Sequence, residues 1–167
     1  GGLSLVAKSG VGSAICHQEK MLRAAKVTVT DVWKEADIVQ INTVLPDSPL
    51  VARRARRQGK KVVYYGHSTM EDFKNSFIGS NLAAPLFKKW IRHCYRQGDV
   101  VITPTEYSRE LLMKYDLHRE IYALTNGVDT EFFHKTEQAG GRFRIFFHLP
   151  VDKKVVISAG HLIHRKG

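Results

Sequence analysis

A histidine followed by polar side chains comes directly after the most strand-like segment of the sequence. Residues 61–66 read Lys-Val-Val-Tyr-Tyr-Gly, a β-branched and aromatic run typical of a central strand, and His67 is next. The polar residues that follow are Ser68, Thr69, Glu71 and Asp72. Imidazole, hydroxyl and carboxylate groups together suit hydrogen bonding to a substrate with many hydroxyl groups. We predict a binding site here; the alternative is a histidine that caps the following helix, with Ser68 and Thr69 as ordinary N-terminal residues.

Two glycines stand at the entrance of a segment whose apolar residues follow helical spacing. Residues 8–14 read Lys-Ser-Gly-Val-Gly-Ser-Ala, which places Gly10 and Gly12 where backbone N–H groups attract a phosphate. A tight turn without a ligand is the alternative. Ile15 replaces the third glycine of G-x-G-x-x-G, yet Asp31 stands where an NAD enzyme carries its ribose-binding acid. A nicotinamide-dinucleotide domain therefore remains an open alternative.

A basic and apolar helix is predicted over residues 82–96. The apolar residues that can share one of its faces are Leu86, Phe87, Trp90, Ile91 and Cys94, and the cations at its margins are Lys88, Lys89, Arg92, His93 and Arg96. Such a helix can lie among lipid headgroups, with Phe87 and Trp90 inserted and Lys88, Lys89 and Arg92 on anionic lipid. A core helix with a solvated basic rim is the alternative.

The sequence ends in a turn rich in cations. Arg165 and Lys166 follow a predicted strand and can neutralise a diphosphate leaving group, although cations at such a position are commonly only solvated. The chain as a whole is basic, with 26 Lys and Arg against 16 Asp and Glu and a net charge of +10. This charge predicts anionic partners. No nucleic-acid motif interleaves the cations with stacking aromatics, so we do not expect nucleic acid among them. A non-catalytic basic module for membrane or nucleic acid remains an open alternative.

Composition excludes several classes of protein. The two cysteines, Cys16 and Cys94, lie far apart without C-x-x-C spacing, which disfavours both a disulfide framework and a zinc site. No run of about 18 apolar residues is present, so any membrane contact is expected to be peripheral. No G-x-S-x-G motif occurs, which disfavours a serine hydrolase. With 43% hydrophobic residues, the 167 residues suffice for one domain and part of a second.

Strands alternate with helices along the sequence. The predicted strands are residues 27–30, 37–42, 61–66, 99–103, 121–124 and 154–159. The predicted helices are residues 11–25, 50–58, 70–77, 82–96, 106–115 and 143–149, with a linker at residues 138–141 and Thr105 capping the fifth helix. This alternation is typical of an α/β fold with a doubly wound parallel sheet, in which ligands bind beyond the carboxyl ends of the strands.

Five short segments, in this order, resemble the family-four retaining glycosyltransferases. They are Ser9-Gly10-Val11-Gly12-Ser13-Ala14, Tyr65-Gly66-His67-Ser68-Thr69, Thr103-Pro104-Thr105, Thr125-Asn126-Gly127-Val128-Asp129 and Gly160-His161-Leu162 to Lys166-Gly167. The similarity is greatest to bacterial members that build glycolipids, notably diacylglycerol glucosyltransferases, in which a His-Ser-Thr segment precedes an acidic pair and Phe, here Glu71-Asp72-Phe73. One departure is His161, which replaces an Arg found in many relatives.

The resemblance implies a GT-B enzyme with two Rossmann-like domains. Residues 1–135 are then the acceptor-binding domain, and residues 136–167 are the linker and a short remnant of the donor-binding domain. The implied reaction moves a sugar with retention from a nucleotide-sugar, UDP-glucose or UDP-galactose, to diacylglycerol or glycosyl-diacylglycerol. No metal or other cofactor is implied. The implied location is cytoplasmic, peripheral on the inner face of the plasma membrane.

The resemblance also implies residue roles. His67 is expected to reach the transferred sugar as the catalytic residue, and Gly10, Gly12, Arg165 and Lys166 to bind the donor. The acceptor-binding residues are expected to be Ser68, Thr69, Glu71 and Asp72. The paired glutamates that hold the donor in the family would follow Gly167, so we expect these 167 residues alone to be inactive.

Overall fold

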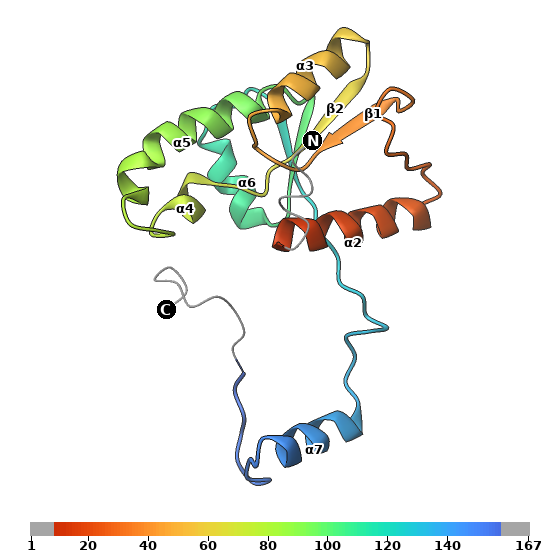
Figure 1. The fold of residues 1–167 in the computed structure, drawn as a ribbon, viewed down its shortest axis with the longest axis vertical. Coiled ribbons are helices and arrows are strands. Elements are labelled where there is room, and N and C mark those ends of the chain that lie inside the picture. The colour runs from red at the N-terminus through yellow and green to blue at the C-terminus, as the bar shows by residue number, and fades with distance from the viewer. Residues whose placement is uncertain (1–8, 158–167) are drawn as a thin grey trace. The chain divides into compact units, whose positions relative to one another are not determined.

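The structure is a computed structural model that describes residues 9–157, in the element order shown in Figure 1. The helices are α2 (Gly10–Ala24), α3 (Ser48–Arg57), α4 (Met70–Phe73), α5 (Ser80–Tyr95), α6 (Glu106–Met113) and α7 (Glu137–Phe146). The strands are β1 (Ile38–Ile41), β2 (Lys61–Tyr65), β3 (Val100–Thr103) and β4 (Glu120–Ala123). The chain divides into two units, residues 1–127 and 128–167, and the sheet lies in the first.

The four strands form one parallel sheet in the order β1-β2-β3-β4. Ile38 pairs with Lys61, Val63 with Val100, and Thr103 with Ala123, so the strands end at the same edge. Short apolar strands buried by crossover helices are expected in such a sheet. The predicted α/β, Rossmann-like fold with a parallel sheet is thus confirmed.

Helices cover both faces of the sheet. Val39 and Ile41 belong to a core shared with residues of α3, α5 and α6, whereas Gln40 contacts Gln18 of α2 through its side chain. Because neighbouring residues of a strand point to opposite faces, α2 lies on the face opposite α3 and α5. The buried core is made of Val39, Ile41, Ala52, Ala55, Val62, Tyr64, Ile91, Cys94, Tyr95, Val101, Leu112, Tyr115 and Leu117.

Side chains at the helix starts explain where several helices begin. Ser9 accepts a hydrogen bond from the Gly12 N–H, Thr69 from that of Asp72, and Thr105 from that of Ser108. Each bond satisfies an N–H that lacks a partner in the first turn. The predicted cap at Thr105 is therefore confirmed. Gly79 precedes α5 with a φ of 86°, a conformation that glycine adopts without strain.

The structure differs from the predicted elements in four places. Residues 27–30 form no strand and pair with no described strand, and residues 154–157 form none either. The predicted helix over residues 70–77 ends at Phe73, because Lys74 is extended with a ψ of 142°. The predicted linker, residues 138–141, is helical within α7. Phe143 and Phe147, one turn apart with ring centroids 4.6 Å apart, favour the helix despite its glycines.

Candidate functional site

The segment after β2 lies at the carboxyl edge of the sheet and is fixed there by β3. The Gly66 N–H donates to the Ile102 carbonyl at 2.6 Å, and the buried Thr103 hydroxyl donates to the Gly66 carbonyl at 3.0 Å. A Cβ at Gly66 would lie 2.9 Å from Cδ1 of Leu112, so the turn passes close to α6. His67 therefore leaves the sheet at a defined point beside β3.

The imidazole of His67 is half-buried and stacks on the ring of Tyr65. The two ring centroids are 5.0 Å apart, with an angle of 21° between the planes. Nε2 of His67 is buried and has no hydrogen-bond partner among the described residues. Burial lowers the pKa of His67 from its ordinary value of 6.5, so the ring is neutral at pH 7. A neutral histidine with an uncommitted nitrogen can hydrogen-bond a sugar hydroxyl.

Two tyrosines that are distant in sequence, one in α5 and one in the turn after α6, hold the residues that follow His67. The Tyr95 hydroxyl accepts from the Ser68 N–H at 3.1 Å and donates to the Ser68 carbonyl at 2.7 Å. The Tyr115 hydroxyl accepts from the Met70 N–H at 2.7 Å and donates to the Glu71 carboxylate at 2.6 Å. Burial raises the pKa of both tyrosines, which keeps both hydroxyls protonated as donors.

Three of the four residues predicted to bind the acceptor make contacts within the fold through their side chains. Thr69 is buried and caps α4, and its hydroxyl donates to the Asp72 carboxylate at 2.9 Å. The Glu71 carboxylate accepts a hydrogen bond from the Tyr115 hydroxyl. Ser68 is held through its backbone. Their side chains therefore fix the course of the loop that begins at His67, and the acceptor-binding role remains a proposal. Tyr95 and Tyr115 were missed, because they are 27 and 44 residues away from their partners.

The N-terminus of α2 carries both predicted donor-binding glycines in its first turn. Gly10 is exposed and a Cβ there would meet nothing within 4 Å, so the space beside it is open, whereas Gly12 is buried. The Gly12 N–H is already bonded to the Ser9 hydroxyl, so a phosphate at this helix start would bind the N–H groups that precede Gly12. Arg165 and Lys166, the other predicted donor-binding residues, lie outside the described residues.

A chain of side-chain amides connects α2 with β1 and with the segment that follows β4. Gln18 is only 2% exposed; its Oε1 accepts from Gln40 at 2.6 Å and its Nε2 donates to Asn126 at 3.0 Å. Gln40 also donates to Asn42, directly after β1. The network places Asn126, in the segment after β4, beside the helix that carries Gly10 and Gly12. No local pattern indicates this network, since 108 residues separate Gln18 from Asn126.

The face of α5 that we predicted to contact a membrane packs instead against the protein. Phe87 stacks on Phe73 with ring centroids 4.2 Å apart, and Trp90 donates to the Val44 carbonyl at 2.7 Å. Lys88 lies 4.5 Å from the centre of the Tyr115 ring. The apolar spacing of the helix was therefore mainly that of a core helix. Of the five predicted membrane-contacting residues, Lys89 is exposed and the other four are partly buried.

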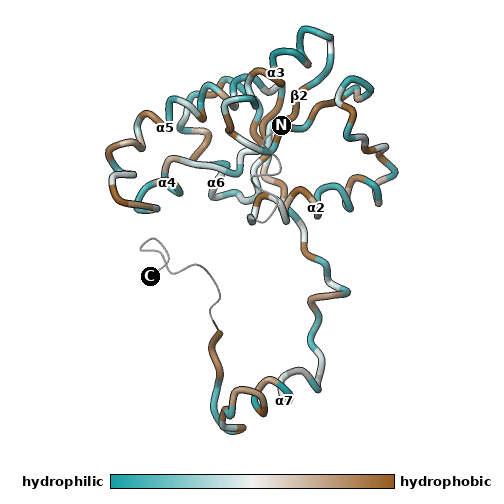
Figure 2. The backbone as a smooth tube through the Cα atoms, viewed as in Figure 1, coloured by the Kyte–Doolittle hydropathy of each residue, from teal (hydrophilic) through white to brown (hydrophobic). Residues whose placement is uncertain are grey.

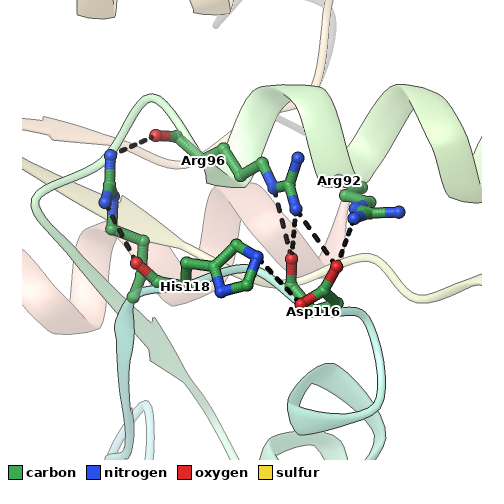
Figure 3. Close-up of polar contacts among 5 residues, drawn as sticks. Arg92, Arg96, Asp116 and His118 are labelled. Atoms are coloured by element: carbon green, nitrogen blue, oxygen red, sulfur yellow. Dashed lines mark hydrogen bonds and ion pairs between the residues drawn. The ribbon is translucent and has the colours of Figure 1, made fainter.

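Arg92 is committed to an ion-pair network with Asp116, which Figure 3 shows. The Asp116 carboxylate lies 2.5 Å from Arg92, 3.4 Å from Arg96 and 2.9 Å from His118, and Arg96 also donates to the Asp116 carbonyl at 2.6 Å. Asp116 and His118 both have a φ of 53°. The network anchors the turn between α6 and β4 to α5.

Asp116→Asn is expected to lower the free energy of unfolding by about 1 kcal/mol, because the pairs are half exposed and screened by water. Asparagine also tolerates a positive φ, so the substitution tests the charge rather than the backbone. Urea denaturation followed by circular dichroism measures the change. Asp152→Asn, at an exposed pair with Lys153, is the control and should shift stability by less than about 0.5 kcal/mol. Equal shifts in the two variants would contradict the network.

A different part of this region carries exposed apolar side chains. Ile78 precedes α5 and is fully exposed, and Leu82 and Leu86, one turn apart on α5, are 90% and 72% exposed. Part of the turn between α4 and α5 is brown, that is hydrophobic, in Figure 2. Lys89 and His93 continue the face of Leu82 and Leu86 at helical spacing, so this outward stripe is apolar first and basic afterwards.

The basic end of this stripe adjoins the cations of α3. Arg53 lies 3.5 Å from Nε2 of His93 and donates to Gln97 at 3.4 Å, so α3 and α5 are neighbours. The arginines of α3 that are exposed are Arg53, Arg54, Arg56 and Arg57, and neither α3 nor α5 contains an acidic residue. We call the stripe of α5 with Ile78 and these arginines the basic–apolar surface.

A pocket lined by residues of α6, β4 and the turn between them, with a cavity volume of about 330 Å³, lies at the amino-terminal end of β4, away from His67. Its arginines make hydrogen bonds within the fold: Arg119 donates to the carbonyls of Gly98, His118 and Arg96, and Arg109 donates to that of Ile121.

Among residues 9–157, no three potential metal ligands gather at one place. No helix in the described part of the chain is long and apolar enough to cross a membrane.

The NAD interpretation loses its structural basis in the described residues. It required Asp31 to follow a strand of the sheet, but residues 27–30 form none and Asp31 is exposed. A family comparison points in the other direction, since the model of Glycosyltransferase Family 4 matches residues 15–132. The chain belongs to glycosyltransferase family 4.

This family domain also has a curated relative. The chain is 34% identical over 168 residues to a processive diacylglycerol alpha-glucosyltransferase of Acholeplasma laidlawii. The match covers 98% of this chain and 49% of the relative, so the chain spans about half the length of the protein it matches. No solved structure is significantly similar to the chain. The resemblance drawn from the short segments is confirmed at the level of the family.

Proposed function

We propose that the chain forms the acceptor-binding part of a glycosyltransferase that makes glycolipids. The donor is a nucleotide-sugar, UDP-glucose or UDP-galactose, and the acceptor is diacylglycerol or a glycosyl-diacylglycerol. Family membership and the diacylglycerol glucosyltransferase among its relatives support this assignment. The observation that carries it is His67, a neutral histidine with a buried, uncommitted nitrogen at the carboxyl edge of a parallel sheet.

The proposed transfer proceeds with retention of configuration and without a metal ion. The bond between the anomeric carbon and the diphosphate oxygen breaks, and the acceptor oxygen bonds to that carbon on the same face. The acceptor proton passes to the leaving diphosphate. His67 hydrogen-bonds a sugar hydroxyl and orients the ring, while the N-terminus of α2 at Gly10 and Gly12 approaches the phosphates. Arg165 and Lys166 neutralise the diphosphate.

The loop after His67 forms a rigid side of the proposed acceptor-binding site. Tyr95 and Tyr115 hold its backbone at Ser68 and Met70, so any polar group of this loop meets the acceptor in one position. Preorganised contacts of this kind reduce the ordering that a substrate must undergo. We propose that Ser68 and Asp72 offer acceptor contacts, while Thr69 and Glu71 act by keeping the loop in place.

The basic–apolar surface fits a peripheral protein on an anionic membrane. Leu82, Leu86 and Ile78 are exposed as an inserting apolar stripe, and the arginines of α3 supply cations for acidic headgroups. We propose that this surface brings the site to its lipid acceptor on the cytoplasmic, inner face of the plasma membrane. Of the residues predicted from the sequence, Lys89 belongs to this surface, and Phe87 and Trp90 support it from beneath.

Vesicle flotation tests this surface in the full-length protein. A Leu82→Gln/Leu86→Gln variant is expected to bind vesicles of mixed phosphatidylglycerol and phosphatidylcholine about tenfold more weakly, because two leucines no longer enter the apolar layer. Met113→Gln, an exposed apolar residue of α6, is the matched control and should bind as the wild type does. Unchanged flotation of the leucine variant would refute the surface.

Calorimetric titration tests the donor. Full-length protein titrated with UDP-glucose, UDP-galactose and NAD is expected to bind one of the two sugar nucleotides and not NAD. Binding of NAD alone would refute the proposed transferase. Appearance of glycosyl-diacylglycerol from the bound donor and diacylglycerol vesicles completes the assignment.

A further inference from the structure

We propose that Tyr65 is a positioning residue for His67: its ring fixes the plane of the imidazole that His67 offers to the reacting sugar. This inference rests on the function proposed above. No described hydrogen bond fixes the imidazole of His67. The ring of Tyr65 is the contact that the structure shows for it, with centroids 5.0 Å apart and planes inclined by 21°.

Tyr65 has the rigidity that such a role needs. It is the last residue of β2, is 3% exposed, and pairs with β3 in the parallel ladder. Its strand partner across the ladder is Ile102. The carbonyl of Tyr65 also accepts a hydrogen bond from the His67 N–H at 3.1 Å. The two residues are therefore in contact through both their backbones and their rings. A ring fixed by a sheet can hold its stacked neighbour in one plane.

The phenol oxygen of Tyr65 plays no visible part in the fold. It is buried and has no hydrogen-bond partner among the described residues. Tyr64, the adjacent residue, differs: it belongs to the core on the other face and donates to the Thr43 carbonyl at 2.7 Å. The two tyrosines of β2 therefore have different roles: Tyr64 stabilises the core, and Tyr65 supports His67.

The stack also keeps His67 neutral. Burial alone accounts for the lowered pKa of His67, with no charged group contributing, and burial likewise raises the pKa of Tyr65. The titratable group that faces His67 from the sheet is thus an uncharged phenol. Removal of the ring admits water to the imidazole, which returns the pKa of His67 toward 6.5.

The experiment compares Tyr65→Leu, Tyr65→Phe and, as the matched control on the same strand, Tyr64→Leu. NMR titration of the His67 ring protons, assigned by their absence in His67→Gln, reports the pKa without any turnover. We expect the pKa of His67 to rise in Tyr65→Leu and to stay unchanged in Tyr65→Phe and Tyr64→Leu. Tyr65→Met provides the same loss of the ring if the leucine variant does not fold.

Steady-state kinetics of the full-length protein complete the test. Tyr65→Leu is expected to lower kcat at least tenfold with KM for the donor within about twofold, and Tyr65→Phe to restore wild-type kcat. An unchanged pKa of His67 without the ring, or an unchanged kcat, would overturn the positioning role. Wild-type turnover in His67→Ala would instead remove the proposed function, and the NMR result would still report separately on the stack.

Discussion

His67→Ala in the full-length protein is expected to lower kcat by about 100-fold or more, with the fold unchanged. Nε2 of His67 is a buried, neutral donor or acceptor on a half-buried ring, and interactions of that kind gain strength where water is excluded. The loss should appear in kcat more than in KM, because we propose that the contact tightens as the sugar leaves the diphosphate. Single-turnover kinetics with labelled donor measures it.

The control for His67 is another histidine outside the site. His118→Asn removes an exposed imidazole 2.9 Å from Asp116 and keeps a residue that tolerates its positive φ of 53°. It should retain wild-type kcat. His67→Gln distinguishes hydrogen bonding from bulk, since its amide can replace one imidazole contact and should recover part of the activity. Wild-type kcat in His67→Ala would exclude the catalytic role.

Tyr95→Ala is expected to lower the free energy of unfolding by about 4 kcal/mol, the largest effect on stability that we predict. The side chain is fully buried and packs edge-on against Tyr64 with ring centroids 5.3 Å apart. Its removal leaves a cavity between α5 and β2, and the two polar groups of Ser68 lose their partner. Urea denaturation of the protein, followed by circular dichroism, gives the change.

Tyr95→Phe separates packing from hydrogen bonding. It keeps the ring and removes only the hydroxyl, so the expected loss is about 1–3 kcal/mol from the unsatisfied Ser68 N–H and carbonyl. The same variant should reduce kcat, because Ser68 follows His67 directly. A loss as large as that of Tyr95→Ala would mean that packing contributes little, and no loss at all would contradict the clamp on Ser68.

The sequence determined the sheet and the place of His67 because both depend on local patterns. The strand run of residues 61–66, with its β-branched and aromatic side chains, predicts a buried parallel strand wherever it lies. Parallel strands end at one edge, so His67 had to stand there. The Thr105 cap was likewise local, since it involves residues three apart.

Periodicity could not decide which face of α5 meets solvent. Phe87, Trp90 and Ile91 have the spacing of a membrane-surface helix and equally that of a core helix. Packing against Phe73 and Val44 resolved the choice, and the exposed stripe is Leu82, Leu86 and Lys89 instead. The same ambiguity affected residues 27–30, where a β-rich composition lacked a described neighbouring strand with which to pair.

Contacts between residues far apart in the sequence hold the site together. Tyr95 reaches Ser68 across 27 residues, Tyr115 reaches Glu71 across 44, and Gln18 reaches Asn126 across 108. Contacts of this kind follow from strand register and helix packing, to which many distant residues contribute, and no short segment encodes them. The sequence therefore placed His67 at the edge of the sheet through local strand chemistry, whereas long-range packing supplied the tyrosines that position its loop.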